Sequence, residues 1–207
     1  MTFPLLRTTC LLLAGLFTGS AAANSATTSH DAMNTNAKSL IVFFSRADEN
    51  YAVGHIEKGN THIIADIIAE QTGADVFRIQ PVTPYPSTYD SCVEQAQQEK
   101  EQNARPAIIG DIDISDYDTI YLGYPNWWGE MPMPVYTFLE KHQWQGKTIY
   151  PFCTHEGSGL SRTPANIARA CPGATVRDGL AIRGSVAQRQ HEAARKAVQA
   201  WLAKHRR

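Results

Sequence analysis

Net charge and cysteine are both scarce in this sequence. Its 19 Lys and Arg residues nearly balance its 20 Asp and Glu residues, so the 207-residue chain has a formal net charge of −1. A chain this close to neutral lacks the basic surface that binds nucleic acids or anionic membranes. Only 4 residues are cysteine, yet 43% of the chain is hydrophobic, which is enough to bury a full core without disulfides or metal ions. We therefore expect one domain of ordinary size that binds no nucleic acid.

The N-terminal region lacks an apolar run long enough for a membrane anchor, which needs roughly 20 residues. A first segment, 1–7, carries a single cation, an apolar stretch covers 11–17, and small residues close the region at 19–23. This order is typical of a secretory signal peptide that is cleaved after Ala23. We expect residues 1–23 to be such a signal peptide, without a twin-arginine pair, so that the chain is exported unfolded. The destination is the periplasm if the source is a Gram-negative bacterium, and cleavage leaves no membrane span.

Cleavage would change both the charge and the cysteine count. Loss of Arg7 takes the formal charge from −1 to −2, and the mature chain keeps three cysteines. An odd number in an oxidising compartment leaves at least one free thiol or an intermolecular bridge, and a bridge between Cys92 and Cys171 stays open. Residues 24–37 are rich in Ser, Thr and Asn without periodicity and predict a disordered linker, so the domain covers 38–207.

Apolar runs alternate with helical patterns from residue 38 onward. The run 40–44 is continuous, which is typical of a strand buried on both faces of a parallel sheet. Isoleucines at helical spacing predict the next helix, and Gly73 is placed to end it. Pro151 is awkward within a strand because proline cannot donate to the ladder, so we expect a bulge or the end of pairing there. Further strands are predicted at 75–80, 119–123, 148–153 and 174–182, and further helices at about 89–103, 134–141 and near the C-terminus.

Five strands alternating with helices predict an α/β fold, a doubly wound parallel sheet with helices on both faces. In such sheets, ligands bind beyond the carboxyl ends of the strands. That rule directs attention to three loops, which follow the strands that end near residues 44, 122 and 153.

The first loop ends where the isoleucine helix begins. Gly59, Asn60 and Thr61 place a flexible backbone and two hydrogen-bonding side chains at this point, where free N–H groups and the helix dipole favour a phosphate. Ser45 can add a hydroxyl, and Arg46 can add a cation if it points inward. Plain N-capping by Asn60 or Thr61 is the competing interpretation.

Two nucleotide-binding motifs are missing from this loop. The stretch 54–61 nearly matches a P-loop, but Asn60 stands where the phosphate-reaching lysine belongs and Lys58 comes two places early. No G-x-G-x-x-G motif follows the first predicted strand. We therefore expect neither nucleotide hydrolysis nor dinucleotide binding.

The second loop, 123–132, holds two adjacent tryptophans in a turn framed by proline and glycine. Trp127 and Trp128 are costly to expose and too close in sequence to share one core pocket. A flat heteroaromatic ligand would account for at least one of them through stacking. The peptide group of Gly129 could approach a ring nitrogen of such a ligand. A packed turn or a hot spot for a protein partner is the alternative.

The third loop, 154–159, contains glycines that permit a close approach of the backbone to a ligand. Ser158 near His155 suggests a hydrolase, but the G-x-S-x-G pattern is absent. Cys153 and His155 lack usable zinc spacing, and no second pair stands elsewhere, so no metal site is expected. By default they are a buried thiol and a surface histidine.

Together the three loops resemble those of the flavodoxin-like proteins, most of all the branch with a Trp-Trp second loop. The resemblance is carried by Ser45 with the GNT at 59–61, by GYPNWWG at 123–129 and by PFCTHEGSG at 151–159. It extends over roughly residues 40–202. It implies a three-layer α/β/α fold with strand order 2-1-3-4-5, and one non-covalent FMN at the switch between the first and third strands.

The resemblance also implies which loop contacts which part of the cofactor. The first loop would hold the FMN phosphate, the second would line the isoalloxazine ring, and the third would close the other side. One departure is the insertion 47–58, where many flavodoxins turn tightly, which suggests a lid or a partner contact. The implied FMN-binding residues are Ser45, Arg46, Gly59, Asn60, Thr61, Pro125, Asn126, Trp127, Trp128, Gly129, Thr154, His155, Glu156, Gly157 and Gly159.

The function that follows is that of an FMN-binding redox protein outside the cytoplasm, in which the protein positions the flavin and the flavin does the chemistry. The electron donor and acceptor, a protein or a quinone, stay open. An NAD(P)H:quinone-type reductase, an electron carrier between proteins and a flavin-free partner-binding module are the competing versions. Export argues against free NAD(P)H as donor, whereas a charge of only −2 argues against a typical acidic carrier.

Overall fold

The computed structural model describes residues 38–205. The expected signal peptide (1–23) and linker (24–37) lie outside the described residues and stay predictions. Within the described part, the strands form one large sheet and one small hairpin. They are β1 (Lys38–Phe44), β2 (Asp48–Asn50), β3 (Gly54–Ile56), β4 (Asp75–Ile79), β5 (Tyr117–Pro125), β6 (Thr148–His155), β7 (Thr175–Val176) and β8 (Leu180–Arg183).

The large sheet is parallel and has the order β4-β1-β5-β6, with the fifth position shared by β7 and β8. When the hairpin is set aside, this order is 2-1-3-4-5 along the chain. The interior strand β1 pairs on both sides, with Leu40 opposite Asp75 of β4 and Ile120 of β5. The predicted fold class is therefore confirmed.

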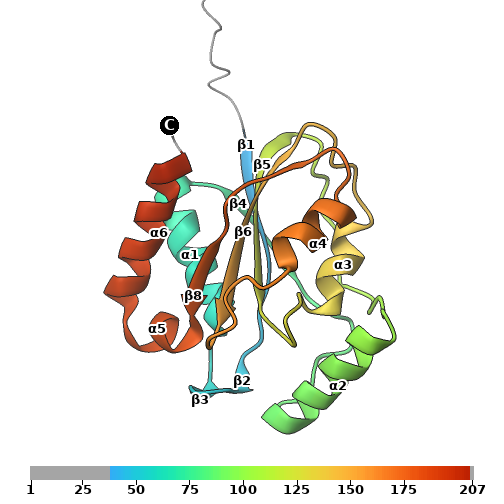
Figure 1. The fold of residues 1–207 in the computed structure, drawn as a ribbon, viewed down its shortest axis with the longest axis vertical. Helices are drawn as coiled ribbons and strands as arrows, with labels where there is room; N and C mark the ends of the chain where they lie inside the picture. The colour runs from blue at the N-terminus through green and yellow to red at the C-terminus, as the bar shows by residue number, and fades with distance from the viewer. Residues whose placement is uncertain (1–37, 206–207) are drawn as a thin grey trace, which may run out of the picture. The chain divides into compact units, whose positions relative to one another are not determined.

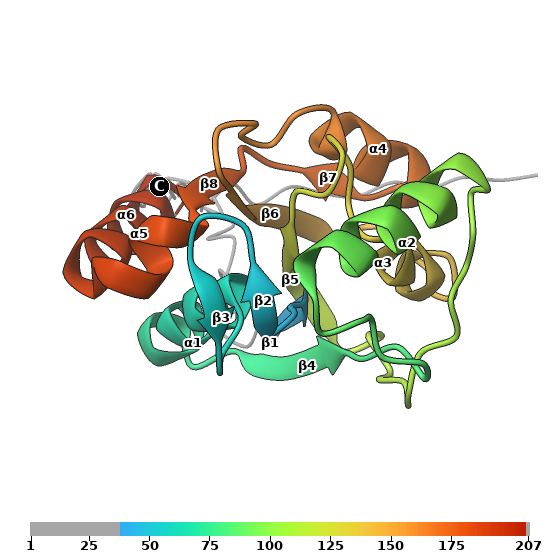
Figure 2. The same cartoon turned by 90° about the horizontal axis from the view of Figure 1, so that it is seen from below.

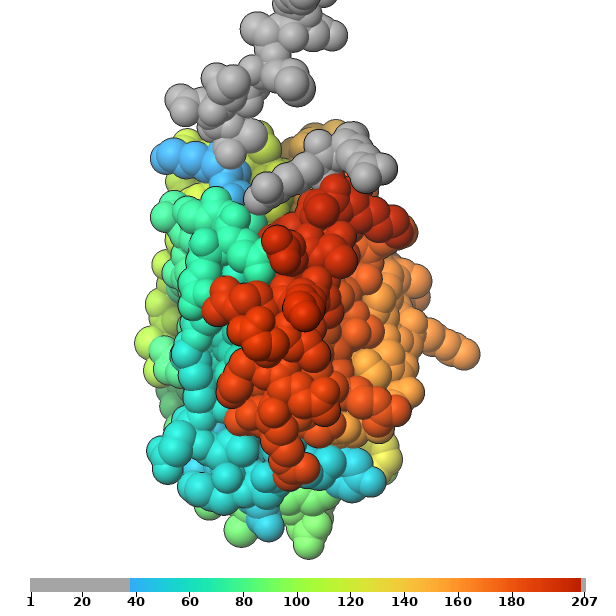
Figure 3. All heavy atoms as spheres, turned by 90° about the vertical axis from the view of Figure 1, so that its left-hand side faces the viewer, coloured from blue at the N-terminus to red at the C-terminus, as the bar shows by residue number. Residues whose placement is uncertain are grey.

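Helices cover both faces of this sheet, because each parallel neighbour requires a crossover connection. They are α1 (Asn60–Thr72), α2 (Tyr89–Glu101), α3 (Met133–Leu139), α4 (Thr163–Ala170), α5 (Gly184–Arg189) and α6 (His191–His205). Helices α3 and α4 lie on one face, and α1, α5 and α6 on the other (Figure 1). Figure 3 shows α1 and α6 side by side on the second face. Seen from below, the β2–β3 hairpin and α2 lie at the end of the sheet where β1 finishes (Figure 2).

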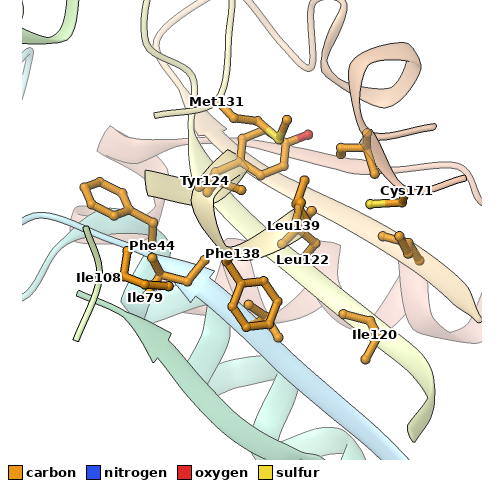
Figure 4. Close-up of a cluster of buried hydrophobic side chains, with 14 of the residues drawn as sticks. Phe44, Ile79, Ile108, Ile120, Leu122, Tyr124, Met131, Phe138, Leu139 and Cys171 are labelled. Atoms are coloured by element: carbon orange, nitrogen blue, oxygen red, sulfur yellow. The ribbon is translucent and has the colours of Figure 1, made fainter. Parts of the chain in front are cut away.

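Apolar side chains are buried on both faces of the sheet. Along β1, Leu40, Val42 and Phe44 belong to the core under α3 and α4, whereas Ile41 and Phe43 belong to the core under α1, α5 and α6. All five are at most 2% exposed, which explains why the run is continuous rather than alternating. Burial of each such side chain contributes about 1.5–3 kcal/mol. Figure 4 shows the first core, where side chains from α3 pack over β1 and β5.

Gly73 ends α1 as predicted. Its φ is +67°, in the left-handed region that favours glycine, and its N–H donates to the carbonyl of Ala69 over 2.8 Å. This arrangement is a common glycine cap at a helix C-terminus. The chain then turns directly into β4.

Pro151 interrupts the pairing of β6 on one side only. Towards β5 the ladder runs without a shift, and Pro151 stands opposite Leu122. Towards the fifth position, β6 pairs with β7 as far as Ile149 and with β8 from Phe152 onward. Proline has no N–H to donate, so the break falls at this residue. The expected edge strand at 174–182 is split into β7 and β8 for the same reason.

Three parts of the fold are not expected from the sequence. The insertion 47–58 forms the β2–β3 hairpin, which is hydrogen-bonded to the loop before α2 and to α5. The N–H of Glu49 donates to the carbonyl of Ser87 over 3.1 Å, and Arg189 Nη2 on α5 donates to the carbonyl of Ala52 over 3.0 Å. Helices α4 and α5 are too short for helical periodicity to show in the sequence.

The cysteines in the described part of the chain are free and buried. Cys92 and Cys171 therefore form no bridge with each other in this structure, although the sequence left that pairing open. Of the helices between residues 38 and 205, none has the length and apolarity that crossing a membrane requires.

Candidate functional site

A cavity of about 310 Å³ lies at the carboxyl ends of β1, β5 and β6. This is the edge at which doubly wound sheets bind ligands, and the volume is at the lower end of the range of about 300–1,000 Å³ for small-molecule sites. The predicted site residues that line the cavity are Arg46, Asn60, Pro125, Asn126, Trp127, Trp128, Thr154, His155 and Glu156.

The other predicted residues lie beside the lining rather than in it. They come from the same three loops and hold the lining residues in place through the contacts described below. They are Ser45, Gly59, Thr61, Gly129, Gly157 and Gly159.

Helix α1 begins at the cavity without capping by its own side chains. Its N-cap is Gly59, and the third N–H, that of His62, donates instead to Ser45 Oγ over 3.1 Å. The N–H groups of Asn60 and Thr61 have no acceptor among the described residues. The competing interpretation, N-capping by Asn60 or Thr61, is not observed. Free N–H groups at the positive end of a helix dipole favour an anion.

Glycine is required where α1 starts, because the backbone of the first loop comes very close. A Cβ on Gly59 would lie 2.3 Å from Ser45 Oγ and 2.4 Å from the carbonyl oxygen of Arg46. The side chain of Asn60 is held from the other side by α5, where Gln188 Nε2 donates to its Oδ1 over 2.9 Å. A Cβ on Gly184 would lie 2.3 Å from Asn60 Nδ2, so this contact is also tight.

Arg46 lines the cavity, but its guanidinium group is occupied by the protein itself. Nε donates to the carbonyl of Pro86 over 3.1 Å. Nη2 donates to the carbonyl of Ser87 over 2.7 Å and to that of Thr88 over 3.3 Å. Nη1 donates to the carbonyl of Glu49 over 2.5 Å. Arg46 therefore joins the hairpin to the loop before α2 while it lines the cavity.

The two tryptophans occupy different environments. Trp127 is half-buried and meets the rings of Phe44 and Tyr85 edge-on, at centroid distances of 5.4 Å and 5.0 Å. Trp128 is 49% exposed at the rim. This difference agrees with the expectation from the sequence that the two tryptophans do not share one core pocket.

The backbone of Trp128 is strained, and hydrogen bonds between this residue and α2 stabilise its conformation. Its φ is +56° and that of Gly129 is +75°, so residues 127–130 form a two-residue hairpin turn with both central residues left-handed. Such a φ is unusual for a bulky residue. Trp128 Nε1 donates to the carbonyl of Val93 over 3.1 Å, and Lys100 Nζ donates to the carbonyl of Trp128 over 2.6 Å. Both contacts come from α2.

Asn126 connects the second and third loops. Its N–H donates to the carbonyl of Thr154 over 2.8 Å, and its Nδ2 donates to the carbonyl of Gly159 over 2.8 Å. Its Oδ1 accepts the N–H of Gly129 over 3.0 Å. The Gly129 N–H, which the sequence suggested for a ring nitrogen, is therefore used within the turn.

The third loop places one histidine and one carboxylate at the cavity. Nδ1 of His155 accepts the N–H of Gly157 over 2.8 Å. Glu156 is turned towards α5, where it accepts the N–H of Ser185 over 2.6 Å and lies 3.7 Å from Arg183 Nη1. Burial lowers the pKa of His155, the nearby Arg183 lowers it further, and Glu156 partly offsets both. Within residues 38–205, no three His, Cys, Asp or Glu side chains gather as metal ligands.

Sequence reasoning missed one wall of the cavity. Its apolar part is a stripe on α2 at positions i, i+3, i+4 and i+7, and this spacing within an otherwise polar helix was the available signal. Its other part comes from the hairpin, where Tyr51 is 64% exposed and lies 5.9 Å from the ring of Tyr89. The missed residues are Asn50, Tyr51, Tyr89, Cys92, Val93 and Ala96.

Comparison with known proteins agrees with this geometry. A provisionally assigned flavoprotein from Bacteroides eggerthii is 28% identical, with a TM-score of 0.64 over 81% of this chain and 97% of its own. A second one, from Bacteroides uniformis, is 26% identical, with a TM-score of 0.65 over 81% of this chain and 99% of its own. A Lactobacillus acidophilus flavoprotein in complex with FMN shares the fold. It is 20% identical, with a TM-score of 0.55 over 75% of this chain and 99% of its own. Among curated proteins there is no significant sequence match.

The family model described as flavodoxin matches residues 52–204, which is most of the chain and includes the second and third loops. The match agrees with the strand order, with the cavity at the switch between β1 and β5, and with the residues that line it. The chain belongs to the flavodoxin family.

Proposed function

We propose that this chain binds one FMN in the cavity at the carboxyl ends of β1, β5 and β6 and serves as a redox protein. The observation that carries the proposal is the pairing of an uncapped helix N-terminus with an aromatic wall in one cavity. Membership of the flavodoxin family supports FMN as the cofactor. When bound, FMN supplies the redox chemistry, and the protein supplies position and electrostatics.

The residues present fit the parts of FMN. The free N–H groups of Asn60 and Thr61, with Arg46 nearby, suit a phosphate group. The apolar stripe of α2 and the two tryptophans suit a flat ring, which stacks on aromatic side chains and is kept from water by them. The cavity volume of about 310 Å³ is of the size that holds one small ligand.

The near-neutral charge favours a small-molecule oxidoreductase over an acidic carrier. A formal charge of −1 for the whole chain provides little long-range attraction for a basic protein partner. A quinone-like acceptor is one of the two classes of acceptor that the sequence left open. Steady-state turnover with reduced nicotinamide and a quinone, compared with reduction of a protein acceptor, separates the two versions.

The visible spectrum of the purified protein, before and after addition of FMN and washing, tests the proposal. We expect a retained flavin band at one FMN per chain. A colourless protein that does not take up FMN would contradict the proposal and favour a flavin-free partner-binding module.

A pair of glycine variants locates the site. Gly59→Ala places a methyl group against Ser45 and the Arg46 carbonyl, so we expect FMN affinity to fall at least about tenfold, or roughly 1.4 kcal/mol. Gly179→Ala is the matched control, since its Cβ would meet Leu160 Cδ1 at 2.9 Å and the Pro151 carbonyl at 3.0 Å. Neither residue lines the cavity. The control should lose stability and keep its affinity for FMN.

A further inference from the structure

His155 is the last residue of β6 and lines the cavity, and its imidazole is held in one tautomer. Nδ1 accepts the N–H of Gly157 over 2.8 Å, so in the neutral ring the proton resides on Nε2. Nε2 has no hydrogen-bond partner among the described residues. The structure therefore presents a fixed N–H donor beside the cavity.

Four other ionisable side chains of the lining are already used or titrate far from neutrality. Arg46 is held by backbone carbonyls, and Glu156 is held by Ser185 and Arg183. Burial raises the pKa of the Cys92 thiol to about 11, and it also raises the pKa of Tyr89. Nε2–H of His155 thus remains available as a donor at the cavity.

The charge state of His155 follows from its surroundings. Burial disfavours the imidazolium, and Arg183 on β8 adds repulsion, while Glu156 supplies only partial compensation. Protonation of Nδ1 would also break its bond from Gly157, which is an independent geometric reason for the neutral form. Near pH 7 the residue therefore acts as a hydrogen-bond donor and not as a cation.

We propose that Nε2–H of His155 donates a hydrogen bond to bound FMN and stabilises the reduced cofactor more than the oxidised one. The inference rests on the proposed function. Reduction adds two electrons, and the ring gains negative charge when fewer than two protons follow them. A hydrogen bond to a charged acceptor is stronger than one to a neutral acceptor. The difference favours the reduced form.

Two substitutions separate the donor from the loop structure. In His155→Asn, the side-chain oxygen can take the place of Nδ1 and accept the Gly157 N–H, but no group reaches the position of Nε2. In His155→Gln, the longer side chain carries its amide to the position of Nε2, while the contact with Gly157 is lost. Asn thus preserves the loop and removes the donor, and Gln does the reverse.

The quantity to measure is the ratio of FMN dissociation constants in the oxidised and the fully reduced protein, obtained by fluorescence titration under air and under anaerobic dithionite. We expect His155→Asn to lower this ratio about tenfold, the equivalent of roughly 1.4 kcal/mol, and His155→Gln to keep it within about threefold of the unmodified protein. The ¹⁵N resonance of Nε2 should move on FMN binding in the unmodified protein. An unchanged ratio in His155→Asn, or equal losses in both variants, would overturn the inference.

Failure of the proposed function has a different signature. A protein that takes up no FMN would overturn the proposed function and this inference together. A protein that binds FMN normally, with an unchanged ratio in His155→Asn, would overturn this inference and leave the proposed function standing.

Discussion

The hydroxyl groups of Thr61 and Thr154 lie 2.7 Å apart, although the two residues are far apart in the sequence. Thr61 belongs to the first turn of α1 and is 1% exposed, and Thr154 belongs to the end of β6 and is 3% exposed. This bond joins the first and third loops underneath the cavity. One hydroxyl must donate and the other must accept. Both are therefore hydrogen-bonded to each other only when the two loops hold these side chains next to one another.

Removal of both hydroxyls of this pair should cost less than the sum of the two single removals. Thr61→Val or Thr154→Val leaves one buried hydroxyl without a partner, so we expect each to lower the free energy of unfolding by about 1–3 kcal/mol. The double variant removes both polar groups and should lose less than the sum of the two single losses. Urea denaturation of the four proteins measures the coupling. Strict additivity would mean that the bond contributes nothing specific.

Arg46→Lys should destabilise the fold even though the charge is conserved. A lysine carries one ammonium group and cannot reach all four carbonyls that the guanidinium group binds on the hairpin and on the loop before α2. We expect a loss of about 1.5–3 kcal/mol in urea denaturation. Arg189→Lys is the control, because Arg189 makes one exposed bond to the carbonyl of Ala52. A loss above about 1 kcal/mol in the control would contradict this assignment.

FMN should protect Cys92 from alkylation and leave Cys171 unaffected. Both cysteines belong to the core under α3 and α4, but Cys92 also lines the cavity and Cys171 does not. Burial raises the pKa of the two thiols to about 11 and about 12, so both should react slowly with a maleimide in the native protein. Mass spectrometry after timed labelling, with and without FMN, gives the two rates. Equal rates for Cys92 in the presence and absence of FMN would place the cofactor elsewhere.

Stability should fall as the pH drops below about 6.5. Burial is the main cause that lowers the pKa of His62, His142 and His155 from the ordinary value of 6.5. Above pH 6.5 the imidazoles are neutral in both the folded and the unfolded chain, so they cause no loss of folding stability there. Below it, the unfolded chain takes up protons first, and stability is lost until the pH has passed the lowered folded-state values. The urea midpoint should therefore be higher at pH 7.5 than at pH 5.5. Replacement of all three by Gln should reduce that difference.

Local patterns in the sequence, together with the resemblance, were sufficient for the fold class. The continuous run 40–44 predicted a strand buried on both faces, and Gly73 predicted the end of α1, because burial and left-handed backbone geometry depend on a few neighbouring residues. The order of strands followed from the alternation of strands and helices and from the resemblance. The residues of the three loops also pointed to the correct edge of the sheet, since parallel strands end there together.

The tertiary structure alone decided how those side chains are used. The guanidinium group of Arg46, a candidate for the phosphate, binds carbonyls before α2, and the N–H of Gly129 donates to Asn126. The wall formed by Tyr51 and Tyr89 arises because a hairpin and a distant helix meet. Hydrogen-bond partners far apart in the chain are chosen by packing, which no local pattern records. The sequence by itself determined the edge at which the site lies, and long-range packing determined which donors at that edge are free.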